Sequence, residues 1–261
     1  MKTTAIKLII INAAALSFLL PGGVNAGKEE RAARKIFKQH KRAVITVRIV
    51  TRQRMIVEGR EMDKGEQRME ATAVIINPEG LAVMSLFESN PWDGFNQSYG
   101  GEDDPEFNWE SEISDLIMHL ESGERIDATL ILRDKDLDML FIKPRKPVKQ
   151  KLSHIDCATG AALTHLDKVV ILGRLGKAAG RVASVSLHTI QSVIPKPRTF
   201  YVPDQTVIMN GLGRPAFTLK GDIAGIVLMR VVNTANGEIK EIPVILPAED
   251  VAEVAEQARE K

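Results

Sequence analysis

The sequence predicts an all-β protein, built as a double barrel and followed by one C-terminal helix. Short segments rich in β-branched residues recur along the chain, which is typical of strands. Turn signals built from proline, glycine and asparagine separate these segments. A single helical pattern follows the last of them. Many short strands, turn signals and one terminal helix together indicate this architecture.

The first 26 residues have the three parts of a signal peptide. Lys2 and Lys7 charge the start, residues 8–20 form an apolar run, and Val24-Asn25-Ala26 offers small residues for cleavage. The run is short for a bilayer span, so we expect a periplasmic or secreted protein without a stable membrane anchor. An uncleaved anchor is the alternative. Cleavage shifts the formal charge from +1 to −1, and a near-neutral exported protein gives no reason to expect nucleic-acid binding.

The first barrel is predicted over residues 27–142, with strands interrupted by clear turns. Its basic amphipathic start is expected to pack Ile36 and Phe37 on this barrel, the alternative being contact with an anionic membrane surface. Asn77-Pro78-Glu79-Gly80 is a turn signal, because proline presets φ and glycine accepts positive φ. The predicted strands are residues 43–50, 69–76, the hairpin 117–126 with Ser122-Gly123 at its tip, 128–132 and 139–142.

The charged, proline-containing residues 143–156 are predicted to link this barrel to a second one over residues 157–246. Asn236-Gly237 is a strong hairpin signal. The second-barrel strands are predicted at residues 167–173, 180–186, 200–202, 206–209, 223–231 and 241–245. Residues 247–261 read as a helix, with proline at the start, acids in the first turn and an apolar face that includes Val251 and Val254.

Three segments, in order, carry a resemblance to HtrA-type members of the trypsin-like serine protease family. Residues 77–87 resemble the strand-turn-strand that delivers the catalytic histidine, and Phe87 stands at its position. Residues 133–143 resemble the stretch with the catalytic aspartate, which is retained as Asp138. Residues 210–226 resemble the nucleophile loop, where Leu212 replaces the serine.

The resemblance implies two six-stranded antiparallel β-barrels of the trypsin-like protease fold with a short C-terminal helix, spanning residues 27–261. We expect no PDZ domain after that helix and no cofactor. The family builds its oxyanion hole from backbone N–H groups of the nucleophile loop, which here assigns that role to the stretch from Asn210 to Gly213, including Leu212. Asparagine tolerates positive φ less freely than the family's glycine.

The catalytic chemistry of that family is missing from this sequence. No histidine lies between His40 and His119, and no serine follows Ser192. A serine protease needs a nucleophile, a base and a group that orients the base. Phenylalanine cannot accept a proton and leucine cannot attack a carbonyl. We therefore expect a non-catalytic pseudoprotease that binds a peptide or protein partner in or beside the inter-barrel cleft. The alternative is an active serine-type endopeptidase, or another hydrolase, with an unrecognised nucleophile.

An acidic, aromatic insertion is predicted over residues 88–112, directly after the vacated histidine position. It contains both tryptophans, and Trp92, Tyr99 and Trp109 are candidate partner-binding residues. The alternative is an Ω-loop that buries these rings on its own barrel. No metal site is predicted, because the acids do not match an EF-hand and the histidines lack partners at ligand spacing. The only cysteine, Cys157, is expected to be a small buried apolar residue.

Overall fold

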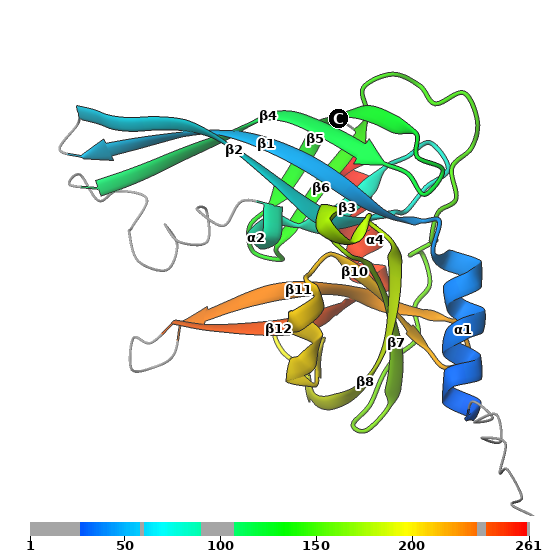
Figure 1. Cartoon of the computed structure of the whole chain (residues 1–261). Coiled ribbons are helices and arrows are strands. Elements are labelled where there is room, and N and C mark those ends of the chain that lie inside the picture. The colour runs from blue at the N-terminus through cyan, green and yellow to red at the C-terminus, as the bar shows by residue number, and fades with distance from the viewer. Residues whose placement is uncertain (1–26, 58–59, 90–106, 234–238, 260–261) are drawn as a thin grey trace, which may run out of the picture.

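The chain forms two closed antiparallel barrels stacked against each other (Figure 1). The structure, a computed structural model, describes residues 27–57, 60–89, 107–233 and 239–259. Within these residues each barrel has six strands, and helices lie at both ends of the chain. This confirms the predicted fold class. No helix among the described residues is long and apolar enough to cross a membrane, and the predicted signal peptide lies outside them.

The first barrel closes in the order β1-β2-β3-β6-β5-β4. Its strands are β1 (Val44–Val57), β2 (Arg60–Ile75), β3 (Ala82–Ser85), β4 (Phe107–His119), β5 (Arg125–Asp134) and β6 (Met139–Pro144). The two predicted turns are confirmed. Gly80 has φ 97° and the Leu81 N–H donates to Asn77 Oδ1 at 2.8 Å. Gly123 at the β4–β5 hairpin tip has φ 88°. Both turns need the positive φ that glycine adopts without strain.

The second barrel closes in the order β10-β11-β12-β9-β8-β7. Its elements are β7 (Lys168–Arg174), η1 (Lys177–Ala179), β8 (Ala183–Ile194), β9 (Phe200–Pro203), η2 (Gln205–Asn210), β10 (Arg214–Thr218), β11 (Ile223–Asn233) and β12 (Ile239–Pro247). The strand predicted at residues 206–209 is wrong, because η2 is a 3₁₀ helix there. Its Val207 N–H donates to the Asp204 carbonyl at 3.2 Å, and the Val207 side chain is buried in the barrel interior.

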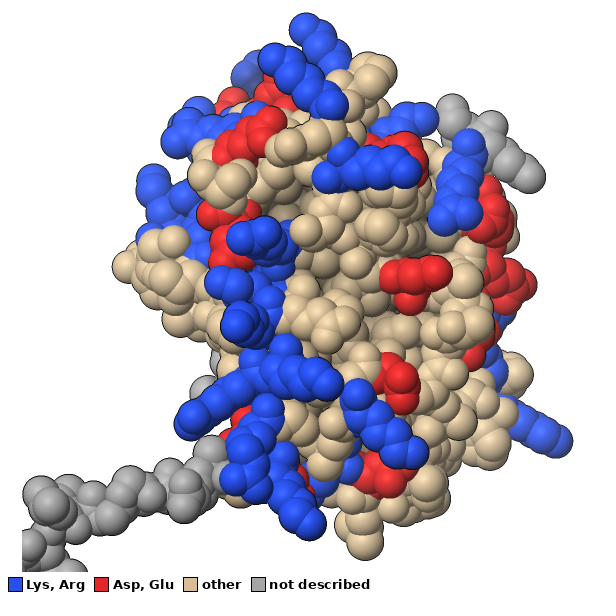
Figure 2. Space-filling model, turned by 90° about the vertical axis from the view of Figure 1, so that its right-hand side faces the viewer, with Lys and Arg blue, Asp and Glu red and all other residues tan. Residues whose placement is uncertain are grey.

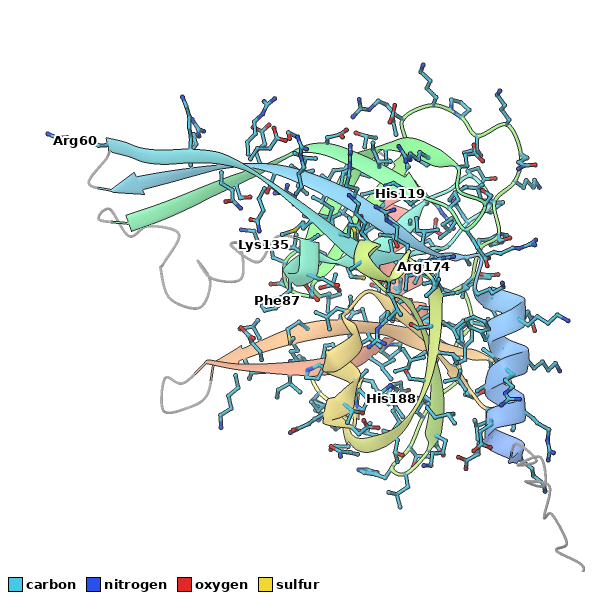
Figure 3. The ribbon with its side chains drawn as sticks, in the orientation of Figure 1. Arg60, Phe87, His119, Lys135, Arg174 and His188 are labelled. Atoms are coloured by element: carbon cyan, nitrogen blue, oxygen red, sulfur yellow. The ribbon has the colours of Figure 1, made fainter. Side chains whose placement is uncertain are left out.

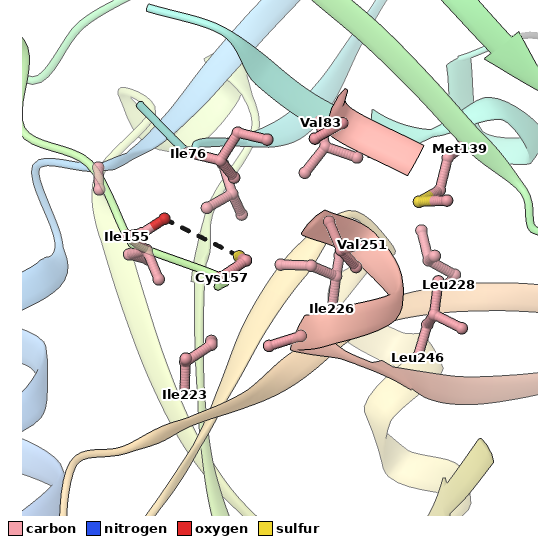
Figure 4. Packing of buried hydrophobic residues seen from close by; sticks show 14 of the residues in the cluster. Ile76, Val83, Met139, Ile155, Cys157, Ile223, Ile226, Leu228, Leu246 and Val251 are labelled. Carbon is pink, nitrogen blue, oxygen red and sulfur yellow. Dashed lines mark hydrogen bonds between the residues drawn. The ribbon is translucent and has the colours of Figure 1, made fainter. Parts of the chain in front are cut away.

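A shared apolar core joins the barrels (Figure 4). Val83 and Phe141 come from the first barrel, Ile226 from the second, and Val251 from α4 (Ala248–Arg259), the predicted C-terminal helix. Cys157 lies in this core, where burial raises the pKa of its thiol to about 12. The cysteine is therefore a buried apolar residue, as expected. Burial of this continuous surface is the main force that holds the barrels together.

The N-terminal helix α1 (Lys28–His40) packs on the second barrel, against β7 and β8, and not on the first barrel as predicted. Ile36 lies beside Gly221, and the His40 ring stacks on Phe217 at 4.7 Å. The sequence showed which face of the helix was apolar but not which barrel would cover it. The opposite face is exposed and basic, and Figure 2 shows lysines and arginines gathered in a column on this side of the molecule.

Two strand pairs project from the same side of the barrels (Figure 1). One is the long β1–β2 ribbon with β4 beside it, and the other is β11–β12. Residues 107–112, predicted as part of the insertion, form the start of β4 and pair with β1, where Trp109 lies opposite Met55. Trp92 and Tyr99 lie outside the described residues.

Candidate functional site

Asp138, the retained aspartate, lies just before β6 and has 6% of its surface exposed. Its φ of 58° is in the left-handed region, which aspartate tolerates better than most residues. Three donors contact its carboxylate. Ser85 Oγ and Met229 N donate to Oδ2, each at 2.7 Å, and Phe87 N donates to Oδ1 at 2.6 Å. The carboxylate therefore connects β3, the short helix α2 (Leu86–Ser89) and β11 across the boundary between the barrels.

The electrostatics of Asp138 are those of a buried structural group. Burial raises the pKa of its carboxyl to about 7, against the opposing effect of the hydrogen bonds from Met229, Phe87 and Ser85. These hydrogen-bonding partners are a hydroxyl and backbone amides, so the aspartate orients no imidazole. Its hydrogen bonds stabilise the junction of the two barrels.

Phe87 is the second residue of α2 and lies directly beside Asp138. Its backbone N–H makes the 2.6 Å contact to the carboxylate, which is the neighbourhood that the resemblance assigns to this residue. Its ring is partly buried against the apolar interior of the second barrel, in the cluster that contains Leu212. The structure therefore brings Phe87, Asp138 and Leu212 together. Figure 3 shows Phe87 where the barrels meet.

Leu212 lies between η2 and β10 with 4% of its surface exposed. Its side chain packs with Val207, Ala216 and other interior residues of the second barrel. Its backbone N–H donates to Glu88 Oε2 at 2.6 Å. A leucine in this position adds apolar contacts and no reactive heteroatom.

Glu88 was not singled out in the sequence, yet it is central to this site. Its carboxylate accepts the Leu212 N–H, and its own N–H donates to Ser85 Oγ at 3.1 Å. Burial raises the pKa of Glu88 to about 7, while the Leu212 hydrogen bond and the charge of Arg214 act in the opposite direction. Only the fold reveals this contact, because 124 residues separate Glu88 from Leu212.

Arg214 stabilises the conformation of the loop that contains Leu212. Its guanidinium is buried and donates to the Gly211 carbonyl at 2.7 Å and to the Val207 carbonyl at 2.5 Å. Burial lowers its pKa to about 10, although nearby Glu88 favours the charged form. The arginine fits because Gly173 has no side chain, and a Cβ there would lie 2.7 Å from Arg214 Cδ. The loop is thus fixed by a buried cation.

Two of the backbone donors expected to line an oxyanion hole already have partners. The Leu212 N–H donates to Glu88, and the Gly213 N–H donates to the Val227 carbonyl at 2.7 Å. Gly213 has φ 66°, and a Cβ there would lie 2.3 Å from the Thr72 carbonyl oxygen of the first barrel. Asn210 ends η2, so the positive φ values of this loop fall on its glycines, Gly211 and Gly213. An oxyanion hole needs donors that are free to meet the developing charge.

Of the other predicted residues, Trp92 and Tyr99 lie outside the described residues. Trp109 is in β4, and the segment that carries Trp92 and Tyr99 begins directly after α2, next to Phe87 and Glu88 in the chain. Among the described residues, no group of three or more histidine, cysteine, aspartate or glutamate side chains is arranged to hold a metal ion.

Comparison with solved structures identifies the fold that contains this site. No protein-family model matches the chain, and no curated protein matches it by sequence. Among solved structures, it is similar to the MamO protease domain from Magnetospirillum magneticum in its apo form. The match covers 83% of this chain and 97% of that chain, with 14% sequence identity and a TM-score of 0.52. At this identity the likeness concerns architecture alone. The chain has the trypsin-like protease fold of two six-stranded barrels.

Proposed function

We propose that this protein is an exported, HtrA-like homologue of the trypsin-like proteases that binds peptide or protein segments without cutting them. The observation that carries the proposal is the contact between Glu88 and the Leu212 N–H. In an active protease this backbone position would present a serine and an oxyanion-hole donor. Here it presents a buried leucine, and its N–H is held by a carboxylate.

The proposal follows from the chemistry of peptide cleavage. Cleavage needs an activated hydroxyl or thiol, a base that takes its proton, and free donors for the oxyanion. At this site Leu212 provides no nucleophile and Phe87 no base. A carboxylate beside Leu212 would also repel the negative charge that develops on a tetrahedral intermediate. A strand edge can pair with a peptide without any of these groups.

Strand β11 has an edge suited to an extended peptide. Beyond Val227, which pairs with Arg214 of β10, strand β11 pairs only with β12 among the described residues. The Met229 N–H points away from β12, since it donates to Asp138 and its β12 neighbour Pro243 has no N–H. Backbone direction alternates along a strand, so the Val231 N–H and carbonyl point to the same open edge.

This edge lies between the projecting strand pairs, on the side of Asp138 (Figure 1). An extended peptide can add to it by β-augmentation, in which main-chain hydrogen bonds supply affinity and side-chain pockets supply selectivity. Val231 is partly exposed. Binding at this edge requires neither a histidine nor a serine.

The test uses fluorescein-labelled unfolded casein, followed by anisotropy for binding and by gel electrophoresis for cleavage. We expect binding without cleavage. Val231→Pro should weaken binding at least tenfold, because proline removes the donor at the open edge while leaving the β12 ladder intact. Val231→Ala keeps the backbone donor and should bind like the wild type. Equal binding by the folded proline variant would refute the assignment of this edge.

A second experiment tests the aromatic insertion as part of the binding surface. Residues 90–106 are replaced by a short glycine-serine linker, which removes Trp92 and Tyr99 but keeps strand β4. Shortening a loop changes closure entropy only modestly, so the barrels should still fold. Casein binding should weaken, and the double substitution of Trp92 and Tyr99 by alanine should reproduce much of the loss. Trp109→Ala tests the third aromatic residue separately. Undiminished binding by the folded linker variant would exclude the insertion as a binding element.

A further inference from the structure

A second group of polar side chains lies on the second barrel, apart from the site described above. Ser186 and His188 are two residues apart on β8, so their side chains project from the same face of the strand. His188 is buried, with 3% of its surface exposed, whereas Ser186 is partly exposed. Asp204 follows β9 and precedes η2. Figure 3 shows His188 beside η2, away from Phe87 at the junction of the barrels.

These three side chains form a continuous hydrogen-bonded chain. Ser186 Oγ lies 2.8 Å from His188 Nε2, and His188 Nδ1 lies 3.1 Å from Asp204 Oδ1. The aspartate is itself fixed, because the Thr189 N–H donates to Oδ2 at 2.8 Å and the Thr206 hydroxyl donates to Oδ1. A hydroxyl, a base and a group that orients the base are therefore within hydrogen-bond reach of one another, in the order that nucleophilic catalysis needs.

The position of each proton follows from the state of Asp204. Burial favours its neutral form, but hydrogen bonds from Thr206, Thr189 and His188 outweigh this effect and lower its pKa to about 2. An ionised carboxylate only accepts hydrogen bonds, so His188 must carry its proton on Nδ1. With that proton on Nδ1, the imidazole accepts a hydrogen bond at Nε2, and Ser186 donates to it. This is the tautomer that lets an imidazole take a proton from serine.

We propose that Ser186 is a nucleophile activated by His188 as general base, with Asp204 as the positioning residue, and that it reacts with small activated esters and phosphonyl fluorides. Small substrates are favoured because the serine is only partly exposed and lies on a barrel strand. The open edge of β11, where a peptide is proposed to bind, belongs to a different part of this barrel. The site is thus independent of the proposed peptide binding, and either can fail without the other.

The reaction steps balance without a cofactor. With a fluorophosphonate, Ser186 Oγ bonds to phosphorus, fluoride leaves with the P–F electron pair, and the hydroxyl proton passes to His188 Nε2. With p-nitrophenyl acetate, Oγ bonds to the acyl carbon, the hydroxyl proton passes to His188 Nε2, and p-nitrophenolate leaves with the C–O electron pair. His188 then releases that proton to the solvent. Water that gives its proton to His188 then hydrolyses the acyl-serine, which releases acetate and restores the Ser186 hydroxyl.

The decisive experiment labels the folded full chain with a fluorophosphonate probe and maps the adduct by mass spectrometry of its peptides. We expect the adduct on Ser186, and none after Ser186→Ala or after heat denaturation of the wild type. Ser184→Ala is the matched control, because Ser184 lies two residues earlier on the same strand face. It should label like the wild type. Absence of a Ser186 adduct on the folded wild type overturns the proposal.

The activating residues are tested by the rate of labelling in variants whose fold is checked by thermal melting. His188→Gln removes the base, and Asp204→Asn removes the charge that fixes its tautomer. Each should slow the reaction by about tenfold or more. Labelling of folded His188→Gln at the wild-type rate would show that Ser186 is not activated by the imidazole, and would also overturn the proposal. If His188→Gln fails to fold, the labelling rate of Asp204→Asn and the mapping of the adduct on the wild type still test the proposal.

Discussion

Asp138 and Asp204 each belong to a hydrogen-bonded cluster that contains a serine, but only the second cluster has a histidine between the serine and the aspartate. Asp138 receives the Ser85 hydroxyl directly, together with two backbone amides. Asp204 is separated from Ser186 by the imidazole of His188. Burial raises the pKa of Asp138 to about 7, whereas hydrogen bonds overcome burial and lower the pKa of Asp204 to about 2.

The difference shows that the role of an aspartate depends on what lies between it and the hydroxyl. A serine hydroxyl that donates directly to a carboxylate has no imidazole beside it to take its proton. The Asp138 cluster therefore stabilises the contact between the barrels and does not activate Ser85. An imidazole between the two groups turns the same residue types into a proton-accepting chain. The fold thus keeps an aspartate where the resemblance expects catalysis, and has a complete Ser–His–Asp chain elsewhere.

The largest expected effect comes from removing each aspartate. Asp138→Ala leaves the Ser85 hydroxyl and the Phe87 and Met229 amides buried without an acceptor, which should destabilise the protein by about 3–5 kcal/mol. Asp204→Ala should cost about 1–2 kcal/mol, because its side chain is 25% exposed and water can replace it. Urea unfolding of both variants measures the difference. A larger loss for Asp204→Ala would reverse the structural assignment.

A pair of glycines with nearly equal φ tests how tightly the Asp138 region is packed. Gly213→Ala places a Cβ 2.3 Å from the Thr72 carbonyl oxygen, whereas Gly180→Ala, at φ 69°, meets nothing within 4 Å. Gly180→Ala should cost about 1 kcal/mol from backbone strain alone. Gly213→Ala should cost about 3 kcal/mol, because the barrels must also separate slightly. Equal shifts in the two unfolding curves would mean that the barrels are not in close contact here.

Restoring the missing side chains should not restore the protease. Leu212→Ser should destabilise the protein by about 1–3 kcal/mol, because it removes buried apolar contacts and buries a hydroxyl. The double variant Phe87→His and Leu212→Ser should still leave casein uncut, since Glu88 continues to occupy the backbone donor at position 212. Casein cleavage by the purified double variant, absent from the wild type, would show that the two substitutions alone removed activity.

The smallest expected effect is a pH dependence that separates the two regions. The folded pKa of Glu88 is about 7, above its ordinary value of 4.5, and Asp138 is raised in the same direction. For a raised carboxyl, the stabilising contribution is fully present below the ordinary pKa and is lost as pH rises to about 7. Asp204 behaves oppositely, since its contribution is lost as pH falls from 3.8 towards 2.

Glu88→Gln isolates one part of this dependence. The amide oxygen still accepts the Leu212 N–H but cannot ionise, so stability should fall less between pH 5 and 8 than in the wild type, by about 1–2 kcal/mol. Urea unfolding at both pH values, with the exposed Glu79→Gln as control, measures this difference. If Glu88→Gln leaves the change in stability between pH 5 and 8 as it is in the wild type, Glu88 is ionised over this whole range. The charge of Arg214 would then outweigh the effect of burial on the pKa of Glu88.

The sequence predicted the features that depend on local chemistry. Gly80 and Gly123 at turns, the strands rich in β-branched residues and the acidic start of α4 are properties of a few neighbouring residues, and each appears in the structure. The region around Asp138 could also be predicted, because the resemblance placed Phe87 and Leu212 near it.

The features that sequence reasoning missed depend on contacts between distant segments. Glu88 meets a backbone N–H 124 residues away, and Arg214 fits because a glycine on another strand leaves room. His188 and Ser186 are close in sequence, but Asp204 reaches them only through the pairing of β8 with β9. The strand predicted at 206–209 is wrong for a similar reason, since Val207 reaches the interior of the second barrel from a 3₁₀ helix.

We propose that the open edge of β11 binds polypeptide and that the protein does not cut it. The most direct measurement incubates the purified protein with fluorescein-labelled unfolded casein, while anisotropy reports binding and mass spectrometry reports any cleavage products. We expect a stable rise in anisotropy and intact casein, both for the wild type and for Ser186→Ala. Cleavage that persists through purification and disappears on substituting a residue of this chain would contradict it.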